Sequence, residues 1–346
     1  MKPLLIAGPC AAESEGQIQE TAAQLSMETL KRGLRLDYFR AGVWKPRSSP
    51  DSFSGAGEQA LPWLADVRRQ FGFEVCVEAL SAKDIEQCLK FGITTFWTGA
   101  RTGVNPKDVQ NLADAVRGVP CTIMVKNPLV PDLKLWCGNI ERFQRAEVHS
   151  VMAIHRGFAL RSENVYRNAP CWEIPIELKV TMPDLPVLCD PSHLCGNVKW
   201  IPQVAQLAMH YGFDGLMAEC HCNPAAALSD ATQQLTPEAW GEMVSQLDFK
   251  TGTSDCMLIK QRALLENIDT QLSELLARRM TAVEEIARIK KENNMAIVQP
   301  QQWNQVKKRY LKSDMDEDYR LFIEQFLLLL HQASINRQNN ITNDQQ

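Results

Sequence analysis

Eight short apolar segments recur in the first 245 residues, and each is followed by a stretch long enough for a helix. They are LLIA (4–7), DYFRA (37–41), FEVCVEA (73–79), ITTFW (93–97), CTIMV (121–125), SVMAI (150–154), PVLC (186–189) and GLMAE (215–219). Strand-length apolar runs alternating with helical stretches are typical of repeated β–α units around a parallel sheet. Eight such units in about 250 residues predict a (β/α)8 TIM barrel, an α/β fold.

The pattern changes near residue 257, where apolar residues begin to recur at every third or fourth position. The segment 257–294 contains no Gly or Pro, which indicates one unusually long helix. Two further helices are predicted over 300–312, with Pro300 in the first turn, and over 316–338. The tail beyond 338 is expected to fray at its end.

This change of pattern predicts two domains. The stretch TGTSD between the two patterns has the composition of a linker. We therefore expect a barrel over 1–245, a linker over 246–256 and an all-α three-helix domain over 257–346.

Ionisable or metal-binding side chains stand directly after nearly every predicted strand. In chain order they are Cys10, Arg40, Lys45, Glu78, Arg101, Lys126, His155, Arg156, Asp190, His193 and Glu219. The carboxyl ends of barrel strands converge on one mouth, where active sites of this fold lie. We therefore predict five cationic side chains and several metal ligands around a single cavity. A degenerate, metal-free barrel is the alternative, and the complete set of ligands and cations argues against it.

Four residues have the chemistry of metal ligands: Cys10, His193, Glu219 and Asp230. A thiolate, an imidazole and two carboxylates suit Mn²⁺, Fe²⁺, Co²⁺ or Zn²⁺ better than Mg²⁺. Taken singly, each has an ordinary structural explanation, such as a core thiol or a loop histidine. A structural zinc site is a second alternative, although its candidate ligands match no common zinc module: Cys189, His193, Cys195, Cys220 and Cys222.

The loop after the second predicted strand is rich in anion-binding groups. The stretch RAGVWKPRSS contains Arg40, Lys45, Arg47, Ser48 and Ser49. Guanidinium, ammonium and hydroxyl groups bind phosphates through charge-assisted hydrogen bonds. A solvated basic loop is the alternative, but it does not account for the proline and the two serines. We expect phosphorylated ligands here.

Composition excludes several other classes. The formal net charge of −4 gives no reason to expect nucleic acid or an anionic membrane as a partner. No apolar run approaches the length of a membrane span, and the N-terminus lacks the apolar core of a secretion signal. With eleven cysteines, an odd number, a cytoplasmic protein with mostly free thiols is expected.

The motifs AGPC, RAGVWKPRSS, GAR, KNP, HRG, DPSH, AEC and LSD, in this order, resemble those of type I 3-deoxy-D-arabino-heptulosonate-7-phosphate (DAHP) synthase. The resemblance is to the smaller-subunit group and covers residues 1–245. The related 3-deoxy-D-manno-octulosonate-8-phosphate synthase shares the barrel and the AGPC start but carries a KANR-type loop, so it is the remoter alternative. One departure is WTGAR, where the family often has Ile before Gly-Ala-Arg, although Arg101 is intact.

The resemblance implies a role for each matching residue. Cys10, His193, Glu219 and Asp230 would bind the divalent metal, with Mn²⁺ preferred over Fe²⁺, Co²⁺ or Zn²⁺. Phosphoenolpyruvate would be held by Arg40, Lys45, Arg101, Lys126 and Arg156. Erythrose 4-phosphate would meet Lys45, Arg47, Ser48 and Asp230. Asp190 would lie behind the metal site and Glu78 near phosphoenolpyruvate. Our own mechanistic hypothesis is that Lys126 moves a proton beside a metal-bound water.

The long helix carries two cations where apolar residues are expected. Arg279 and Lys290 fall on the stripe formed by Leu265, Ile268, Leu272, Leu276, Val283 and Ile286, and they share a face about three turns apart. In the last helix, Leu327 and Leu330 are followed on one face by Ser334 and Gln338. Burying such groups is costly unless a partner, such as a dianionic ligand, satisfies them. The alternative is that the long side chains reach water.

Residues 257–340 resemble the all-helical chorismate mutase. The resemblance places Arg262, Arg279, Lys290, Ser334 and Gln338 in the site. Arg262 would enter the pocket of a second protomer, so a homodimer or larger assembly is expected. Arg262 and Arg279 would grip carboxylates, and Lys290 and Gln338 would bond the ether oxygen. In a departure, Gln299, Gln302 and Trp303 stand where the family has Asp, Arg and Glu.

The expected function is therefore a bifunctional enzyme of aromatic biosynthesis. The barrel would use phosphoenolpyruvate and erythrose 4-phosphate, and the helices would rearrange chorismate to prephenate. The helical domain would also mediate feedback inhibition. The alternative is a catalytically weak or inactive helical domain that senses chorismate or prephenate.

Overall fold

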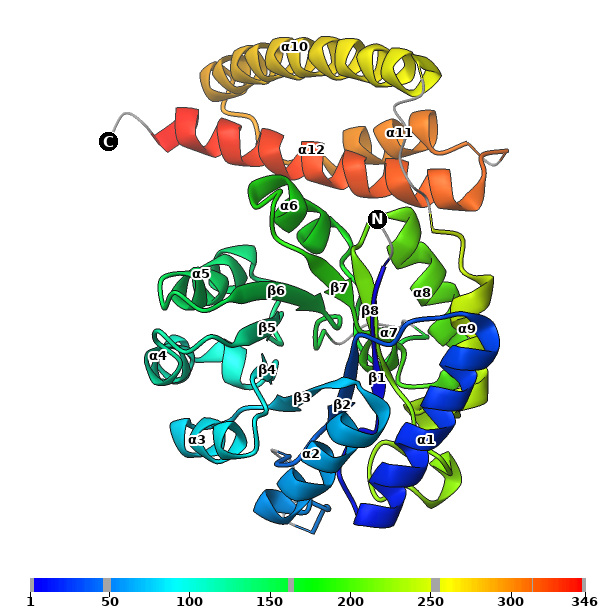
Figure 1. The fold of residues 1–346 in the computed structure, drawn as a ribbon. Helices are drawn as coiled ribbons and strands as arrows, with labels where there is room; N and C mark the ends of the chain where they lie inside the picture. The colour runs from blue at the N-terminus through cyan, green and yellow to red at the C-terminus, as the bar shows by residue number, and fades with distance from the viewer. Residues whose placement is uncertain (1–2, 46–50, 161–164, 250–255, 313, 344–346) are drawn as a thin grey trace. The chain divides into compact units, whose positions relative to one another are not determined.

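The eight apolar segments are strands, and they close into a parallel barrel in chain order (Figure 1). The strands are β1 (Leu4–Gly8), β2 (Tyr38–Ala41), β3 (Glu74–Glu78), β4 (Thr95–Thr98), β5 (Thr122–Lys126), β6 (Ser150–His155), β7 (Val187–Cys189) and β8 (Gly215–Glu219). Each pairs with its neighbour, and β1 also pairs with β8, with Gly8 opposite Glu219. The TIM-barrel prediction is confirmed.

The computed structural model describes residues 3–45, 51–160, 165–249, 256–312 and 314–343. For residues 256–264, 266–267 and 342–343 it describes the backbone alone. The chain divides into two compact units, Met1–Thr251 and Gly252–Gln346. The predicted linker lies mostly outside the described residues.

Helices follow the strands around the outside of the barrel. They are α1 (Glu15–Arg32), α2 (Ala60–Phe71), α3 (Ala82–Lys90), α4 (Pro106–Ala115), α5 (Leu133–Gln144), α6 (Glu173–Thr181), α7 (Pro191–Cys195), α8 (Ile201–His210) and α9 (Pro237–Gln246). Short 3₁₀ turns are η1 (Gly57–Gln59), η2 (Thr102–Val104), η3 (Val198–Trp200), η4 (Pro224–Ala226) and η5 (Ala231–Gln233). Local sequence determines where several of these helices begin. For example, Ser14 caps α1, because its hydroxyl accepts a hydrogen bond from the Gln17 amide.

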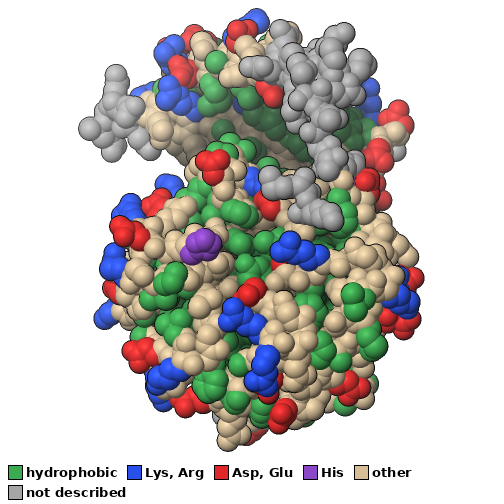
Figure 2. Space-filling view, viewed as in Figure 1, with side chains coloured by type: hydrophobic (Ala, Val, Ile, Leu, Met, Phe, Trp, Pro, Cys, Tyr) green, Lys and Arg blue, Asp and Glu red, His purple; other side chains and the backbone are tan. Residues whose placement is uncertain are grey.

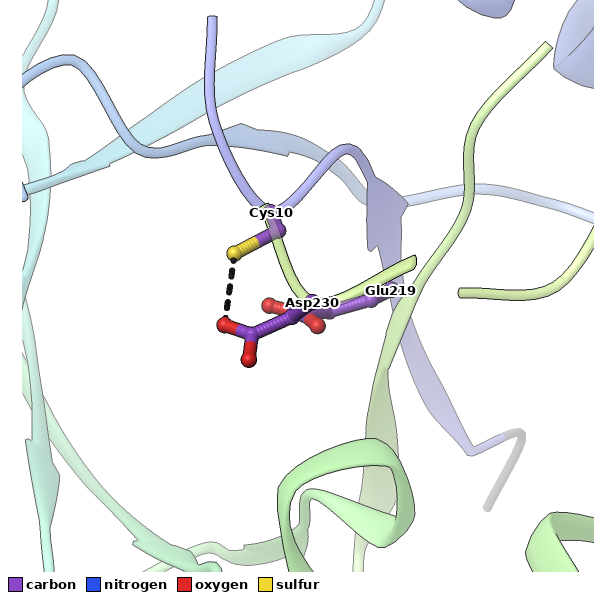
Figure 3. A group of neighbouring side chains, drawn as sticks. All are labelled: Cys10, Glu219 and Asp230. Carbon is purple, nitrogen blue, oxygen red and sulfur yellow. Dashed lines mark hydrogen bonds between the residues drawn. The ribbon is translucent and has the colours of Figure 1, made fainter. Parts of the chain in front are cut away.

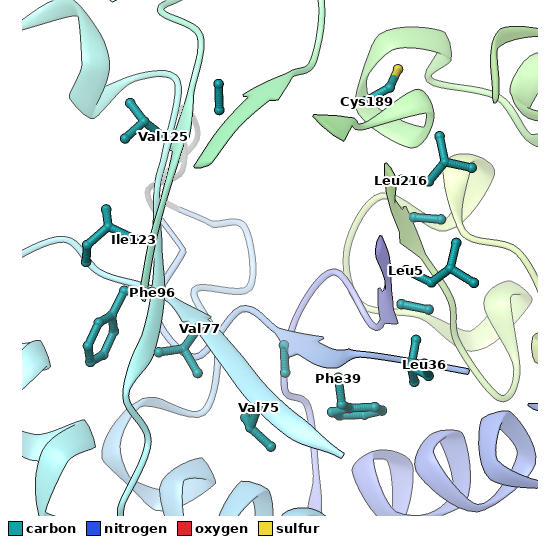
Figure 4. Packing of buried hydrophobic residues seen from close by; sticks show 14 of the residues in the cluster. Leu5, Leu36, Phe39, Val75, Val77, Phe96, Ile123, Val125, Cys189 and Leu216 are labelled. Carbon is teal, nitrogen blue, oxygen red and sulfur yellow. The ribbon is translucent and has the colours of Figure 1, made fainter. Parts of the chain in front are cut away.

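Alternation along the strands separates two hydrophobic layers. Outward side chains such as Leu5, Phe39, Val75 and Phe96 join the large core between strands and helices (Figure 4). Inward side chains form a smaller cluster of Ile6, Cys76, Trp97, Met124, Met152, Ile154, Leu188 and Met217. On each strand, the inward position that follows this cluster lies nearer the end of the barrel where the carboxyl ends of the strands meet.

The second unit contains three helices, α10 (Cys256–Glu292), α11 (Pro300–Tyr310) and α12 (Glu317–Asn343), which confirms the predicted helical domain. Helix α12 extends five residues beyond the predicted end at 338. This extension is polar but free of Gly and Pro, and it gains support from α10, because Lys291 donates to the Ile341 carbonyl at 3.4 Å.

The predicted apolar stripe of α10 is only partly buried. Val283 and Ala287 are buried, whereas Leu265, Ile268 and Leu272 are 59%, 48% and 42% exposed in the single chain. In the single chain most of the predicted stripe is thus exposed, including Ile286 at 45%, so α12 alone does not bury it.

Charged side chains of both signs are interspersed over the face in view in Figure 2, in keeping with the small net charge. None of the helices in the described ranges combines the length and apolar character needed to cross a bilayer.

Candidate functional site

The charged residues of the mouth continue the inward faces of the strands. Four charged residues each stand two positions beyond an inward residue of their own strand. They are Arg40 in β2, Glu78 in β3, Lys126 in β5 and Glu219 in β8. Because the side-chain period of a strand is two, each of these groups turns toward the barrel axis. All four are buried.

Asp190 is the centre of the buried charge network. Its Oδ2 accepts from Lys126 Nζ at 2.7 Å and lies 2.8 Å from His193 Nδ1. Arg40 Nη1 lies 3.8 Å from the same oxygen, and Oδ1 caps α7 by accepting from the His193 amide. Burial by itself would raise the pKa of Asp190, but His193, Lys126 and Arg40 together hold it well below its usual range.

This network determines which nitrogen of the His193 ring carries the proton. An ionised Asp190 can only accept, so Nδ1 carries the proton and Nε2 keeps its lone pair. Nε2 lies 3.6 Å from Glu219 Oε1. Burial is the main reason that the pKa of His193 is lowered, which favours the neutral imidazole that binds metals.

Cys10, Glu219 and Asp230 form a compact group of potential metal ligands (Figure 3). One ligand atom from each lies within 4.8 Å of the others, and Cys10 Sγ donates to Asp230 Oδ2 at 3.3 Å. Burial, assisted by Glu219, raises the pKa of the Cys10 thiol to about 12. A divalent cation would favour the thiolate, because metal binding displaces ligand protons.

The donor set fits a first-row divalent ion. The three residues provide a sulfur and carboxylate oxygens. The predicted fourth ligand, His193, is not in this group, although its Nε2 lies 3.6 Å from Glu219 Oε1. Among the described residues, Cys10, Glu219 and Asp230 are the one set of three His, Cys, Asp or Glu side chains whose ligand atoms lie close enough to share an ion. That these three and His193 bind the metal together stays a prediction. The residues of the structural zinc alternative, all within the described ranges, form no such group. Cys189, Cys195 and Cys220 belong to the large hydrophobic core between the strands and the surrounding helices.

Asp230 has a strained backbone. Its φ of 46° and ψ of 38° place it in the left-handed region, which is uncommon for residues other than glycine. Arg167 donates to Asp230 Oδ1 at 3.0 Å and to Gln233 Oε1 at 2.8 Å. Strain of this kind persists only where surrounding contacts hold it, and it is frequent at functional sites.

Sequence reasoning missed three residues of this network. Arg167 lies in a loop, Gln233 Nε2 donates to Glu219 Oε2 at 2.7 Å, and Gln234 accepts from the Cys10 amide at 2.9 Å. No strand register or motif pointed to them. The one available signal was the position of Gln233 and Gln234 just after the LSD motif.

A pocket opens above the network, and it gathers most of the predicted substrate-binding residues. Its lining includes Lys45, Glu78, Arg101, Lys126, Arg156, Arg167, His193 and Asp230. Lys45 Nζ lies 3.7 Å from Glu78 Oε2, and Arg156 donates to Asn168 Oδ1 at 2.9 Å. Arg47 and Ser48 lie outside the described residues, so their predicted roles stay untested.

Arg40 and Trp97 lie close to Lys126, which lines this pocket. The Arg40 guanidinium is completely buried, donates to Glu219 Oε1 at 3.0 Å and has its Cζ 4.9 Å from the centre of the Trp97 ring. Lys126 Nζ lies 5.8 Å from the same ring. Arg40 Nε has no hydrogen-bond partner among the described residues, so a buried donor remains available to an anionic ligand.

His155 does not face the mouth, contrary to the prediction. It is an outward residue of β6 and packs among Trp136, Phe158, Trp172 and Phe213. Burial, with a smaller contribution from Arg156, lowers the pKa of His155 to about 3. The strand alternation that turns Ile154 inward accounts for this error.

The predicted helical-domain residues come together between α10 and α12. Arg279 donates to the Ser334 hydroxyl at 2.8 Å, and Lys290 donates to Gln338 Oε1 at 3.3 Å and to the Ile297 carbonyl at 2.6 Å. Ser334 and Gln338 are buried. The side chain of Arg262 lies outside the described residues.

Helix α11 contributes an aromatic group to the same region. The rings of Trp303 and His331 stack with centroids 4.0 Å apart and an angle of 10°. Lys307 Nζ lies 6.0 Å from the Trp303 ring centre. Gln302 is exposed.

Comparison with known proteins matches each unit to a family. The model of the DAHP synthetase I family matches residues 1–252, and that of chorismate mutase type II matches residues 261–339. A phospho-2-dehydro-3-deoxyheptonate aldolase of Thermotoga maritima is 28% identical over 243 residues, which cover 70% of this chain and 68% of the relative.

Similarity extends to a second activity class and to solved structures. A 2-dehydro-3-deoxyphosphooctonate aldolase of Thiobacillus denitrificans is 26% identical, covering 76% of this chain and 93% of the relative. The crystal structure of the Thermotoga maritima DAHP synthase superposes with a TM-score of 0.61 at 27% identity, covering 70% of this chain and 68% of that one.

Proposed function

Because the chain belongs to the DAHP synthetase I family, we propose that its barrel condenses phosphoenolpyruvate with erythrose 4-phosphate and water to give DAHP and phosphate. The C-terminal chorismate mutase type II domain is proposed to rearrange chorismate to prephenate. The observation that supports the barrel activity best is the ligand group of Cys10, Glu219 and Asp230 beside the cationic pocket.

Cys10, His193, Glu219 and Asp230 are proposed to hold a divalent metal, Mn²⁺ before Fe²⁺, Co²⁺ or Zn²⁺. When bound, this ion supplies Lewis-acid polarisation of the aldehyde carbonyl of erythrose 4-phosphate. Asp190 holds the His193 ring in the tautomer that offers Nε2, and Arg167 and Gln233 hold the carboxylates of Asp230 and Glu219 in place.

The pocket cations are proposed to bind the two anionic substrates. Arg101, Lys126 and Arg156 line the pocket and would neutralise the phosphate and carboxylate of phosphoenolpyruvate, with Arg40 close to Lys126. Lys45 lies beside Glu78 and would serve both substrates. Arg47 and Ser48 are proposed for the erythrose phosphate. Fixing two like-charged molecules in one orientation removes much of the entropic barrier.

The reaction forms a carbon–carbon bond and a carbon–oxygen bond to water, and it breaks the carbon–oxygen bond to phosphate. A proton is lost by the water, and one is gained by the former aldehyde oxygen, which becomes a hydroxyl. C3 of phosphoenolpyruvate attacks the aldehyde carbon, water adds at C2, and the C2–O bond to phosphate breaks. Lys126 is the proposed proton carrier. Burial lowers the pKa of this lysine even though Asp190 opposes the shift, which brings the ammonium closer to releasing its proton at neutral pH.

A substrate assay tests this proposal and separates the two relatives' activities. An octonate product has eight carbons, so that class joins phosphoenolpyruvate to a five-carbon aldose phosphate. Loss of phosphoenolpyruvate is measured with erythrose 4-phosphate and with arabinose 5-phosphate. We expect activity with the four-carbon aldehyde, loss of activity with a chelator and recovery with Mn²⁺. Consumption only with the five-carbon sugar would contradict the proposal.

The residues Arg279, Lys290, Ser334 and Gln338 between α10 and α12 form what we call the helical site. It is proposed to bind a dicarboxylate in a fixed conformation. Arg279 would hold a carboxylate, while Lys290 and Gln338 would stabilise the ether oxygen of the breaking bond. Arg262 would come from a second protomer. The exposed Leu265, Ile268 and Leu272 support an assembly of at least two chains, which light scattering of the full chain would test.

A sensor of chorismate or prephenate that inhibits the barrel is the second candidate function of this domain. Gln299, Gln302 and Trp303 favour it, because neutral groups stand where relatives carry charged ones. Loss of chorismate absorbance would establish catalysis, and tight binding without loss would establish a sensor. Both functions coexist if prephenate also lowers synthase activity.

The cysteines with described side chains are all free thiols. This supports the proposal of a reducing, cytoplasmic location.

A further inference from the structure

The imidazole of His331 lies within the helical site. Helix α12 presents it one residue after Leu330, whose carbonyl accepts from Arg279 at 3.4 Å, and three residues before Ser334, which accepts from the same guanidinium at 2.8 Å. The other face of this region is formed by α11, because Trp303 stacks directly on the imidazole. All three helices therefore meet around His331.

Among the described residues, the charged groups that act on His331 are two cations of α10, Arg279 and Lys290. On α11, Lys307 Nζ lies 6.0 Å from the centre of the Trp303 ring that stacks on the imidazole. Partial burial, and then the charges of Arg279 and Lys290, lower the pKa of His331. The histidine is therefore neutral near pH 7 while no anion is bound. Arg279 and Lys290 meanwhile donate to neutral oxygens of Ser334 and Gln338 rather than to carboxylates.

We propose that His331 is a third, ligand-induced cation of the helical site, and that it takes up a proton when a compact dicarboxylate binds between Arg279 and Lys290. The proposal rests on the function proposed for this domain. Two negative charges would offset the field of the two cations, and a carboxylate lying beside the imidazole would favour its protonated form. The Trp303 ring face would then stabilise the imidazolium.

Proton counting on the full-length protein tests this proposal. Prephenate is titrated calorimetrically at pH 7 in two buffers with different ionisation enthalpies. We expect an uptake of roughly half a proton per ligand at pH 7, and an affinity that falls about threefold between pH 6.5 and 7.5 and levels off at higher pH. The substitution His331→Gln should abolish both effects while the helical signal in circular dichroism is retained.

Matched variants assign the proton to this histidine. His210→Gln changes an exposed histidine of α8 in the barrel and should leave uptake unchanged. Trp303→Phe keeps an aromatic ring and should retain uptake, whereas Trp303→Leu should reduce it. This pair keeps the proposal testable if His331→Gln does not fold.

The outcomes separate this proposal from the function on which it rests. Prephenate binding by the wild-type chain without proton uptake, or equal uptake by His331→Gln, would overturn the role of His331 and leave the dicarboxylate site intact. Absence of prephenate and chorismate binding would overturn both.

Discussion

The barrel mouth and the helical site both collect cations, but they stabilise them differently. Arg40 and Lys126 are 0% and 5% exposed and pair with the carboxylates of Glu219 and Asp190. Arg279 and Lys290 instead donate to a hydroxyl, an amide and backbone carbonyls. In the barrel, the charges of the site are therefore also part of the folded core. In the helical domain, no carboxylate among the described residues forms an ion pair with Arg279 or Lys290.

The largest expected effect comes from removing the buried barrel ammonium. Lys126→Met should lower synthase turnover about a thousandfold or more, because proton transfer and anion binding are lost together. Metal binding and chorismate turnover should be unchanged. Phosphoenolpyruvate loss, metal content and chorismate absorbance measure the three properties.

A matched lysine provides the control. Lys199 also lies over a tryptophan, 4.7 Å from the Trp200 ring centre, but is exposed. Lys199→Met should retain full activity. Normal turnover by Lys126→Met would remove this lysine from the mechanism.

A second comparison concerns stability. Glu219→Gln should destabilise the barrel by about 3 kcal/mol or more in metal-free buffer, because it leaves the Arg40 charge buried with a weaker partner. Glu284→Gln removes the partner of Arg337, which is 49% exposed in the helical domain, and should cost at most about 1 kcal/mol. Urea unfolding followed by circular dichroism measures both. Equal losses of unfolding free energy in the two variants would show that burial does not set the cost of breaking these ion pairs.

The pH dependence of barrel stability should reflect His155. Its pKa is about 3 in the folded chain and about 6.5 when unfolded, so the unfolded chain binds more protons between these values. Stability should thus be full above pH 6.5 and fall as pH drops, by about 3 kcal/mol at pH 4.

His155→Phe isolates this contribution. Carboxylates also titrate toward pH 4, but the variant keeps them, so its stability should fall less steeply between pH 6.5 and 5. Tryptophan fluorescence during urea unfolding follows the barrel. Identical slopes for the variant and the wild type would show that His155 is not responsible.

The smallest change in the free energy of unfolding is expected when Arg279 of the helical site is replaced, although function should fall strongly. Arg279→Ala should reduce chorismate turnover or binding about a hundredfold and change the free energy of unfolding by less than about 1 kcal/mol. Synthase activity without added prephenate should not change. A global loss of helicity would instead indicate that Arg279 is structural.

Elements were predictable where one local rule decides them. Strand-length apolar runs identified all eight strands, and the absence of Gly and Pro identified α10. Side-chain direction depends on register as well, which is why His155 was placed in the mouth although it faces the outer core.

Contacts between distant loops were not predictable in this way. Arg167 reaches Asp230 across 63 positions of the chain, and nothing in its own neighbourhood indicates that partner. The exposure of Leu265 and Leu272 has a similar cause: periodicity identifies an apolar face but does not say which chain covers it.

Closure of the barrel between its first and last strands has a consequence for biosynthesis. Cys10 follows β1, Glu219 ends β8, and Cys10 and Asp230 are separated by 220 positions. A nascent chain still lacking β8 would have no complete site for the proposed ion, whatever its other strands have formed. Metal uptake should therefore be a late event during translation, and once it occurs it should oppose reopening of the seam between β1 and β8 by mass action.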